Sequence, residues 1–445
     1  MGFCNVIFII SSEAMPNSGK LRFSGIYFNS KEGSAVMGER QSKILGGTML
    51  IAGTSIGSAI LAMPIMTGLF GFLGTIVIMI ACWLFMYWTA TLILEAVLQF
   101  DDGASFISMA RAALGKLGAG VTWCTFLFLF YSLVAAYLRG SGHIMIDALE
   151  GITQIELPKY FDILPLLIIF APFIYFGLSI VDHLNRYLMI GMFLTYGVII
   201  IWLIPLIQPD RLLYVNWSFS LLSFSVVVTS FGYHNIIPTL VTYLERDVKS
   251  IKACLFFGSF IPLALYVIWE LAILGTLPVN GPHGLAQAFK ADQPLARLLR
   301  FAVQSDFISA LAQGFSIFAI VTSFLGVAQG LFDFLKDGLR AGTSHSMRIL
   351  AFFLTFLPPV LLILVFESGF IALLEYAGAL VAIILGIIPI LIVWSLRSKK
   401  GKALEYRAPG NRLALALGIV FFAFVVMLVV LKNAGLISFN VDQLI

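Results

Sequence analysis

Long runs of apolar residues, separated by short polar segments, dominate the pattern of this chain. A helix of about 18 apolar residues or more is long enough to cross roughly 30 Å of hydrocarbon. Transmembrane β-strands would instead be about 10 residues long and alternate apolar with polar positions. The pattern predicts eleven membrane-spanning helices, at residues 44–69, 74–99, 118–138, 163–180, 185–207, 219–244, 251–277, 306–333, 348–366, 370–396 and 412–432.

The composition agrees with this pattern, because 60% of the 445 residues are hydrophobic and only 11% are charged. A soluble protein carries roughly 25% charged residues. The cysteines lack CxxC spacing, so we interpret them as small core residues rather than as disulfides or metal ligands. No segment interleaves bases with aromatic residues as nucleic-acid binding would require. The sequence therefore predicts an all-α polytopic membrane protein with membrane lipid around it, no metal site and no cofactor.

The placement of Lys and Arg predicts the orientation in the membrane. Cytoplasmic loops carry an excess of these residues. Most of the 27 bases fall on one side if the N-terminus is inside, including the clusters before residue 44 and at 397–412. We therefore expect the N-terminus inside and the C-terminus outside. Glu95 and Glu375 lie near the ends of their spans, where a structural role is expected.

The first 41 residues precede the first span and differ from the rest of the chain. Residues 11–36 are polar and rich in Ser, Gly and Asn, as in a disordered tail. The apolar residues 1–10 lack a basic leader, so a cleaved signal peptide is not expected. We predict a disordered cytoplasmic tail at 1–41, with Met37 as an alternative start to Met1. A short outer tail is predicted at 433–445.

Two spans contain a polar, glycine-containing segment near their middle. Gly53–Ala59 interrupts the first span, and Ser230–Asn235 interrupts the sixth. Glycine lowers the cost of unusual dihedrals, and the prolines that follow, Pro64 and Pro238, remove a donor. An unwound stretch in hydrocarbon leaves amide and carbonyl groups without partners, so it is tolerated only against protein or a wet cavity. Glycines that merely permit close helix packing are the alternative interpretation.

The two interruptions occupy equivalent places in two five-helix units. Spans 1–5 cover residues 44–207, spans 6–10 cover residues 219–396, and the helix at 412–432 is additional. An odd number of spans per unit gives the units opposite orientations, which makes the repeat inverted. Paired broken helices of this kind mark the substrate site of transporters.

The chemistry of two unwound breaks suits a zwitterion. The N-terminus of a half-helix presents free N–H groups and a positive dipole end, which hold a carboxylate. Freed carbonyls and half-helix C-termini hold an ammonium or a sodium ion. An α-amino acid carries both charged groups and fits both breaks at once.

The sequence also resembles the aromatic branch of the hydroxy/aromatic amino acid permeases, from about residue 42 to 432. The likeness is carried by Gly46–Pro64, Tyr131–Gly142, Thr229–Pro238, Gly258–Gly275 and Thr322–Phe334. This resemblance implies a fold of the amino acid–polyamine–organocation superfamily, with leucine-transporter-like inverted repeats. It also implies proton-coupled uptake of tyrosine or tryptophan through the bacterial inner membrane.

The predicted substrate-binding residues lie at the two breaks and in the third span. The resemblance implies that Tyr131 lines the pocket, while Tyr137, nearer the outer end, is interpreted as an interfacial anchor. Stacking of Phe231 or Tyr233 on an aromatic substrate would contribute roughly 0.5–1.5 kcal/mol beyond burial. The predicted set is Gly53, Thr54, Ser55, Ile56, Gly57, Tyr131, Ser230, Phe231, Gly232, Tyr233 and His234.

Four residues are candidates for coupling an ion to transport. A carboxylate inside a span is costly and has a functional role by default, which selects Glu270 for the coupling proton. His234 suits proton handling, although a neutral imidazole bonded to a freed carbonyl is the alternative. In sodium-coupled relatives of the fold a Thr/Ser pair ligates sodium, which selects Thr322 and Ser323. Intrahelical bonding of these hydroxyls is the alternative.

A secondary amino acid symporter is therefore the predicted function, with tyrosine first and tryptophan or phenylalanine as alternatives. A sodium-coupled symporter of the same fold is the second hypothesis. A channel is the third, but no span shows a filter motif or a charged ring. The motifs HExxH and GxxxxGK[ST] are absent, and neither an enzyme nor direct ATP drive is expected. No obligate protein partner is indicated.

Overall fold

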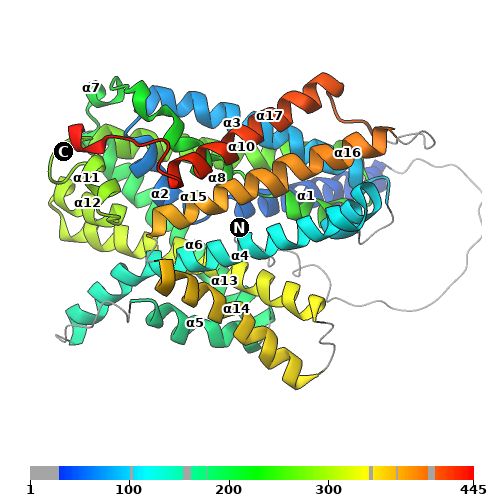
Figure 1. Ribbon diagram of the computed structural model, residues 1–445, viewed down its shortest axis with the longest axis horizontal. Helices are drawn as coiled ribbons and strands as arrows, with labels where there is room; N and C mark the ends of the chain where they lie inside the picture. Colours follow the sequence, from blue (N-terminus) through cyan, green and yellow to red (C-terminus); the bar gives the residue numbers. More distant parts are fainter. Residues whose placement is uncertain are drawn as a thin grey trace, which may run out of the picture.

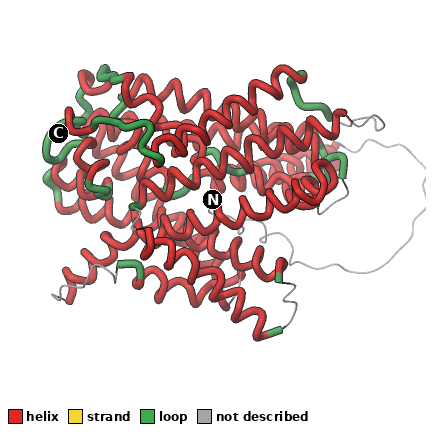
Figure 2. The backbone as a smooth tube through the Cα atoms, in the orientation of Figure 1, coloured by secondary structure: helices red, strands yellow, loops and turns green. Residues whose placement is uncertain are grey.

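The computed structural model describes residues 30–100, 104–153, 162–176, 178–339, 344–366, 369–398 and 406–444. Within these ranges the backbone is almost entirely helical and contains no strand (Figure 2). The main helices are α1 (Ser30–Ser55), α2 (Ala59–Thr67), α3 (Phe72–Val97), α4 (Phe106–Thr153), α5 (Leu164–Phe176), α6 (Leu178–Leu203), α8 (Phe224–Ser230), α9 (Ile237–Tyr243), α10 (Val248–Thr276), α11 (Leu285–Lys290), α12 (Leu295–Val303), α13 (Asp306–Gly338), α14 (His345–Phe366), α15 (Phe370–Val381), α16 (Ile388–Ser398) and α17 (Arg412–Asn433).

Nine helical segments of the described chain are long and apolar enough to cross a membrane, and the bent pair α1–α2 makes a tenth. The fourth predicted span corresponds to α5, whose 13 residues are fewer than the roughly 20 of a full crossing. The prediction of a polytopic helical membrane protein is confirmed. The predicted number of eleven crossings is not established by length and composition.

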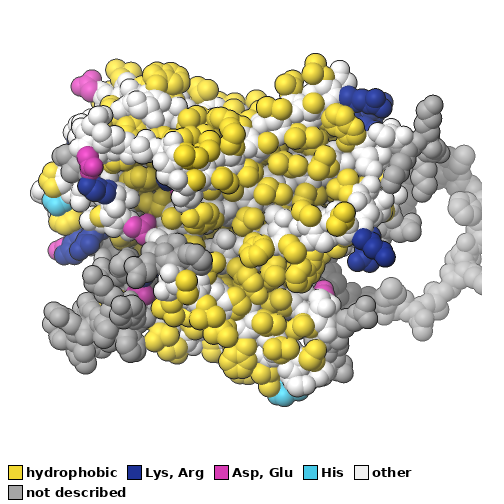
Figure 3. Space-filling model, in the orientation of Figure 1, with side chains coloured by type: hydrophobic (Ala, Val, Ile, Leu, Met, Phe, Trp, Pro, Cys, Tyr) yellow, Lys and Arg dark blue, Asp and Glu magenta, His cyan; other side chains and the backbone are white. Residues whose placement is uncertain are grey.

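The surface agrees with a protein surrounded by lipid. Hydrophobic side chains cover the middle of the molecule, while Lys, Arg, Asp and Glu gather toward the two ends of its long axis (Figure 3). The main helices run roughly along this axis (Figure 1). A bilayer requires an apolar belt around the middle of the helices with the charged residues near their ends, since charged groups are costly in hydrocarbon.

The helices form two packed groups. In one group α10 packs on α1 and α3, while α8 packs on α2 and α3. In the other, α13 packs on α4, α5, α6 and α14, which lie together in the lower half of Figure 1. Helix α15 contacts both groups, through α4 and α8. The two interrupted spans therefore belong to the same group.

Ion pairs fix the additional helix and its loop to the bundle. The fully buried Glu95 of α3 pairs with Arg397 of α16 at 2.6 Å, and the same carboxylate accepts a hydrogen bond from the Ala408 amide. Glu375 of α15 pairs with Lys432 of α17, also at 2.6 Å. The expected structural role of both glutamates is confirmed.

Two predicted boundaries differ from the structure. Helix α1 begins at Ser30, so helix extends into the predicted tail at 1–41, of which residues 1–29 lie outside the described residues. Helix α4 continues to Thr153, well past the predicted end of the third span at residue 138. Both extensions contain polar residues, which hydropathy alone excludes from a span.

Candidate functional site

The first predicted interruption is present where the sequence places it. Helix α1 ends at Ser55, α2 begins at Ala59, and the two axes differ by 56°. Between them, the Gly57 amide makes no backbone hydrogen bond among the described residues and lies close to the Tyr266 hydroxyl of α10. The next amide, that of Ser58, donates to Ser323 Oγ of α13 at 2.9 Å. Both donors at the N-terminus of α2 therefore face side-chain hydroxyls rather than backbone carbonyls.

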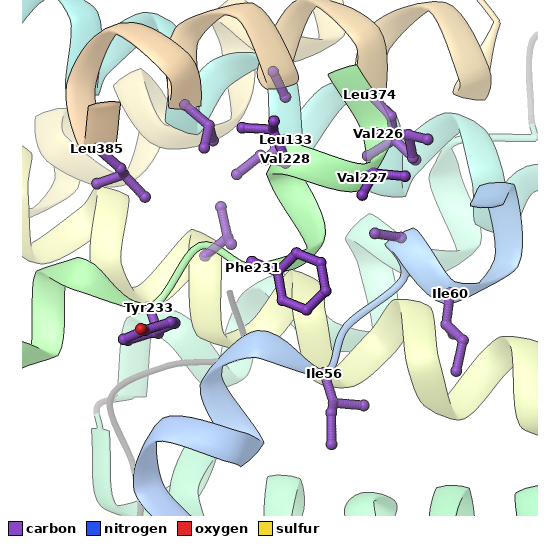
Figure 4. Close-up of a cluster of buried hydrophobic side chains, with 14 of the residues drawn as sticks. Ile56, Ile60, Leu133, Val226, Val227, Val228, Phe231, Tyr233, Leu374 and Leu385 are labelled. Carbon is purple, nitrogen blue, oxygen red and sulfur yellow. The ribbon is translucent and has the colours of Figure 1, made fainter. Parts of the chain in front are cut away.

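The second interruption is also present. Helix α8 ends at Ser230, a turn at Phe231–Tyr233 follows, and a short 3-10 segment, His234–Ile236, leads into α9. The Tyr233 amide has no hydrogen-bond partner in the described part of the chain. Figure 4 shows Phe231 between the two unwound segments, near Ile56, whereas Tyr233 lies farther from the first one.

Tyr266 of α10 joins the two interruptions. Its hydroxyl donates to the Ser55 carbonyl at 2.7 Å and lies 3.4 Å from the Ser230 carbonyl. These carbonyls are the C-terminal ends of α1 and α8, so two negative dipole ends converge on one hydroxyl. Phe231 meets the Tyr266 ring edge-on, with centroids 5.8 Å apart. A hydroxyl proton satisfies only one of the two carbonyls fully, which leaves acceptor capacity for a cation.

Helix α10 also contacts the half-helix after the first interruption. Trp269 Nε1 donates to the Ile60 carbonyl at 2.9 Å. Glu270 is completely buried, and its Oε2 lies 2.9 Å from the Thr67 hydroxyl, while its Oε1 has no partner among the described residues. The predicted intramembrane carboxyl therefore lies at the far end of α2, four residues from Tyr266 on the same face of α10.

Two spaces of very different size lie beside the interruptions. A cavity of about 10 Å³ at the first interruption is lined by Gly57, Ser58, Tyr137 and Thr229, among others. A single water needs roughly this volume. A cavity of about 570 Å³ lies beside the second interruption, next to Asn235 and Pro238. In this conformation the space between the breaks is closed, and the open space lies to one side of them.

Comparison with known proteins shows the family of the chain. The model of the tryptophan/tyrosine permease family matches residues 40–430. The chain belongs to this family. It is 33% identical to a tryptophan-specific transport protein of Pseudomonas aeruginosa, over 86% of this chain and 93% of that protein. It is 31% identical to tyrosine-specific transport system 1 of Haemophilus influenzae, over 90% of this chain and all of that protein. Glutamine transporter 2 of Aliivibrio fischeri is 28% identical over 85% of this chain and 97% of that protein.

Family membership decides the broad class of function. The family and its relatives are permeases and transport proteins. The prediction of a membrane transporter rather than an enzyme is therefore confirmed, and the apolar helices make this permease a multi-pass membrane protein.

The permease does not need glycine at the breaks for the predicted reason. The residues with left-handed backbone include Gly71 and Gly115, but neither Gly57 nor Gly232. The prediction that glycine there permits unusual dihedrals is wrong. Gly53, Thr54 and Ser55, which the sequence places inside the break, form the last turn of α1 instead, where carbonyls are left over.

The two tyrosines of α4 singled out in the sequence face different neighbours. Tyr131 donates its hydroxyl to the Leu354 carbonyl of α14 at 3.0 Å, and so is directed toward a different helix from the interruptions. Tyr137 is only 2% exposed and lines the small cavity, with its side chain close to the hydroxyls of Ser58 and Ser323. The interpretation of Tyr137 as an interfacial anchor is wrong, because an anchor must reach the bilayer surface.

His234 is fully buried and faces α3 rather than the space between the breaks. Its Nε2 lies 2.8 Å from the Thr89 hydroxyl, and its Nδ1 has no partner in the described chain. The sequence suggested a carbonyl freed by the break as the hydrogen-bond partner of His234. The structure gives it the Thr89 hydroxyl of α3 instead. The buried Tyr233 ring packs beside it, with centroids 5.0 Å apart.

Thr322 and Ser323 differ in what their hydroxyls contact. Thr322 Oγ1 donates to the Phe318 carbonyl of its own helix at 2.8 Å, which is the intrahelical alternative. Ser323 Oγ donates to the Ala319 carbonyl at 2.8 Å and accepts from the Ser58 amide. Only Ser323 therefore contacts the first interruption.

Proposed function

We propose that this permease imports aromatic amino acids by proton symport through alternating access. Tyrosine is the first candidate, with tryptophan and phenylalanine as alternatives. The support is the pair of interruptions joined by Tyr266, together with relatives whose names specify tryptophan or tyrosine. The relative named as a glutamine transporter makes a direct competition test necessary.

The charged head of the amino acid has a separate partner for each group. The Ser55 and Ser230 carbonyls end two helices and would hold the ammonium, in competition with the Tyr266 hydroxyl. The Gly57 amide, which makes no backbone hydrogen bond, and the Ser58 hydroxyl beside Tyr137 would hold the carboxylate at the N-terminus of α2. Each group of the zwitterion then meets a helix end of opposite sign.

Movement of one helix group against the other would expose this site to each side in turn. The group of α1, α2, α3, α8, α9 and α10 contains both breaks, and the group around α13 contributes Ser323. This division supports a 5+5 inverted repeat with α17 as an additional helix and eleven crossings in total. We place the protein in the bacterial inner membrane with the N-terminus inside, because the basic clusters are cytoplasmic in that orientation.

Glu270 is the proposed carrier of the coupling proton. The Thr67 hydroxyl lies 2.7 Å from the Met63 carbonyl and 2.9 Å from Glu270 Oε2, but it has one proton to donate. When Glu270 is protonated, it donates to Thr67, and Thr67 donates to Met63. When Glu270 is ionised, the Thr67 proton turns to the carboxylate and the Met63 carbonyl loses it. Protonation would thus alter the contact between α10 and α2.

His234 and Ser323 carry the remaining coupling hypotheses. His234 would hold a proton against Thr89, away from the substrate. In the sodium-coupled alternative, Ser323 would contribute its hydroxyl beside the first break, with Thr322 turning away from its own helix. These hypotheses differ in the ion that drives uptake.

Uptake by purified protein in liposomes tests the proposal. Labelled tyrosine is supplied under an imposed pH gradient, with and without sodium, and each of the twenty amino acids is added as a competitor. We expect saturable, sodium-independent uptake that only aromatic amino acids inhibit. If uptake requires sodium, the coupling ion is sodium rather than the proton. The absence of uptake of any aromatic amino acid would overturn the proposal.

A further inference from the structure

Pro64 removes one hydrogen bond from the first turns of α2. A helical amide donates to the carbonyl four residues earlier, but proline has no amide hydrogen. Pro64 lies inside α2, so the carbonyl that loses its partner is that of Ile60. Ile60 is buried, and it lies at the start of the half-helix that follows the unwound segment (Figure 4). A buried carbonyl without a partner is costly, so this position needs a donor from outside the helix.

Trp269 of α10 supplies that donor. Its indole Nε1 donates to the Ile60 carbonyl at 2.9 Å, and the bond is buried. An indole N–H is a donor only, so the bond has one possible direction. Because the donor belongs to another helix, the first turn of α2 is fully hydrogen-bonded only while α10 stays in place beside it.

A second proline in the chain shows the same arrangement. Pro358 lies inside α14, and the carbonyl four residues earlier is that of Leu354. The Tyr131 hydroxyl of α4 donates to this carbonyl at 3.0 Å. At both positions a side chain of a neighbouring helix replaces the bond that the proline removes, and the two helices are joined as a result.

Trp269 belongs to a face of α10 that contacts the whole broken span. Tyr266, Trp269 and Glu270 have the spacing of neighbours on one helix face. Tyr266 bonds the end of α1, Trp269 bonds the first turn of α2, and Glu270 lies beside the last turn of α2. Of the three, Trp269 is the residue that bonds the backbone of α2 itself.

The indole ring of Trp269 also contacts the other helix group. It stacks on Tyr196 of α6 with centroids 5.6 Å apart, and it lies 4.9 Å from the Phe315 ring of α13. Trp269 is only 1% exposed, so these rings and α2 enclose it. The position of its N–H therefore depends on α6 and α13 as well as on α10.

We propose that Trp269 is a positioning residue for substrate binding. Its N–H fixes the first turn of α2, and thereby the Gly57 amide and the Ser58 hydroxyl that receive the substrate carboxylate. Trp269 acts through α2 rather than on the substrate. The inference rests on the proposed function, because that function assigns the carboxylate to this end of α2.

Replacements at residues 64 and 269 test the exchange of bonds in the purified full-length protein. Trp269→Phe keeps a ring beside Tyr196 but removes the donor, so the melting temperature should fall by a few degrees. Pro64→Ala provides an amide that reaches the Ile60 carbonyl within α2. The double variant should therefore melt above Trp269→Phe. If it melts no higher, the indole does not replace the bond that Pro64 removes, and the inference is overturned.

Trp83→Phe is the matched control for these replacements. Trp83 is also a buried tryptophan, and its Nε1 donates to the Ser259 hydroxyl of α10 at 3.1 Å, away from α2. Adding Pro64→Ala should not raise the melting temperature of Trp83→Phe. An equal rise in both backgrounds would mean that Pro64→Ala stabilises α2 without regard to Trp269, which would also overturn the inference.

Equilibrium binding separates positioning from stability. The Kd of tyrosine should rise about tenfold in Trp269→Phe and should stay raised in the double variant, because Ala at residue 64 restores a bond within α2 but none to α10. Tyramine, which lacks the carboxylate, should bind both variants as it binds the wild type, and Trp83→Phe should bind tyrosine normally. Wild-type affinity of the double variant for tyrosine, or an equal loss of affinity for tyramine, would leave Trp269 with only a structural role.

A binding competition with all twenty amino acids separates this inference from the proposed function. If the wild type binds another amino acid but no aromatic one, the proposed substrate is wrong. The same comparison, with that amino acid and its decarboxylated amine, then still decides the role of Trp269. If the wild type and all variants bind tyrosine equally, the inference fails alone. Binding of none of the twenty would overturn both.

Discussion

The Tyr266 hydroxyl of α10 donates to the Ser55 carbonyl of α1 at 2.7 Å, although the two residues are 211 positions apart in the sequence. The Ser230 carbonyl lies 3.4 Å from the same oxygen. One side chain therefore contacts the ends of both broken helices. A substrate ammonium that binds these carbonyls must displace this hydroxyl or share the carbonyls with it, which couples substrate binding to the position of α10.

Replacing Tyr266 by Phe should therefore reduce transport more than it reduces stability. The variant keeps the ring contact with Phe231 but leaves the Ser55 carbonyl without its partner, at a cost of about 1–3 kcal/mol. We expect the rate of tyrosine uptake to fall by about tenfold or more while thermal unfolding shifts by only a few degrees. Uptake and thermal unfolding are measured on the same purified preparation.

Tyr196→Phe is the matched control for this prediction. Tyr196 donates its hydroxyl to the Leu265 carbonyl at 2.9 Å, so it also bonds a backbone group of α10, but away from the breaks. It should lose comparable stability and retain uptake. If both variants lose uptake equally, the hydroxyl of Tyr266 has only a structural role.

Glu270→Gln should separate exchange from proton-driven accumulation. Glutamine imitates the protonated carboxyl, since it can still donate to the Thr67 hydroxyl, but it never ionises. Exchange of labelled for unlabelled tyrosine should continue, while accumulation under a pH gradient should disappear. Full accumulation by Glu270→Gln would exclude this carboxyl as the proton carrier and would leave His234 as the remaining candidate.

Gly258→Val should separate α1 from α10. A side-chain carbon at Gly258 would stand 2.6 Å from Ile51 Cβ and 2.9 Å from the Thr48 carbonyl, which is too close for either to remain in place. Overpacking of this kind costs about 1–3 kcal/mol, so the melting temperature should fall by several degrees. Gly314→Ala on α13 meets no atom within 4 Å and should melt like the wild type. Equal melting of both variants would contradict the close approach.

The ion pair at the start of α10 should stabilise the protein only above the acid range. Asp247 pairs with Arg40 and accepts a hydrogen bond from Ser250 at 2.6 Å. The Ser250 bond, and then the Arg40 charge, lower the pKa of Asp247 below its ordinary value, against a partial opposing effect of burial. A lowered pKa in the folded state means that this stabilisation is present above the unfolded pKa and is lost as the pH falls through the folded one.

Asp247→Asn measures this contribution. Asparagine can still cap α10 at the Lys249 amide with its one oxygen, while the charge and the bonds that Oδ2 accepts from Ser250 and Arg40 are lost. The pair is largely exposed, and we expect a difference of at most about 1 kcal/mol from wild type at neutral pH. Thermal unfolding is measured from about pH 7 down to about pH 3, which spans the ordinary titration of an aspartate, and this difference should shrink toward the acid end. A constant difference would assign the effect to packing.

The sequence could place both interruptions because their cause is local. The polar residues of Gly53–Ala59 and Ser230–Asn235 lie within otherwise apolar runs, and the helices end inside these segments, at Ser55 and Ser230. The reason assigned to glycine was wrong, since backbone dihedrals depend on how neighbouring helices support the unwound segment.

Tertiary contacts decided what the sequence could not. Tyr131 and Tyr137 are both tyrosines of one apolar helix, and their spacing does not show which of them faces the first break. Tyr266 was overlooked although it lies four residues before Glu270, because its acceptors belong to helices far away in the chain. The π-helical turn at Ala382–Ile387 between α15 and α16 was likewise not predicted, since no proline or polar residue marks its position.

The central claim is that the ends of two broken helices hold both charged groups of one amino acid. Equilibrium binding of labelled tyrosine to the purified protein tests it, with tyramine and 3-(4-hydroxyphenyl)propionate as competitors that lack the carboxylate and the ammonium respectively. Each competitor should bind at least about a hundredfold more weakly than tyrosine, since each leaves one helix end without its partner. Competition by either compound at the strength of unlabelled tyrosine would contradict the account.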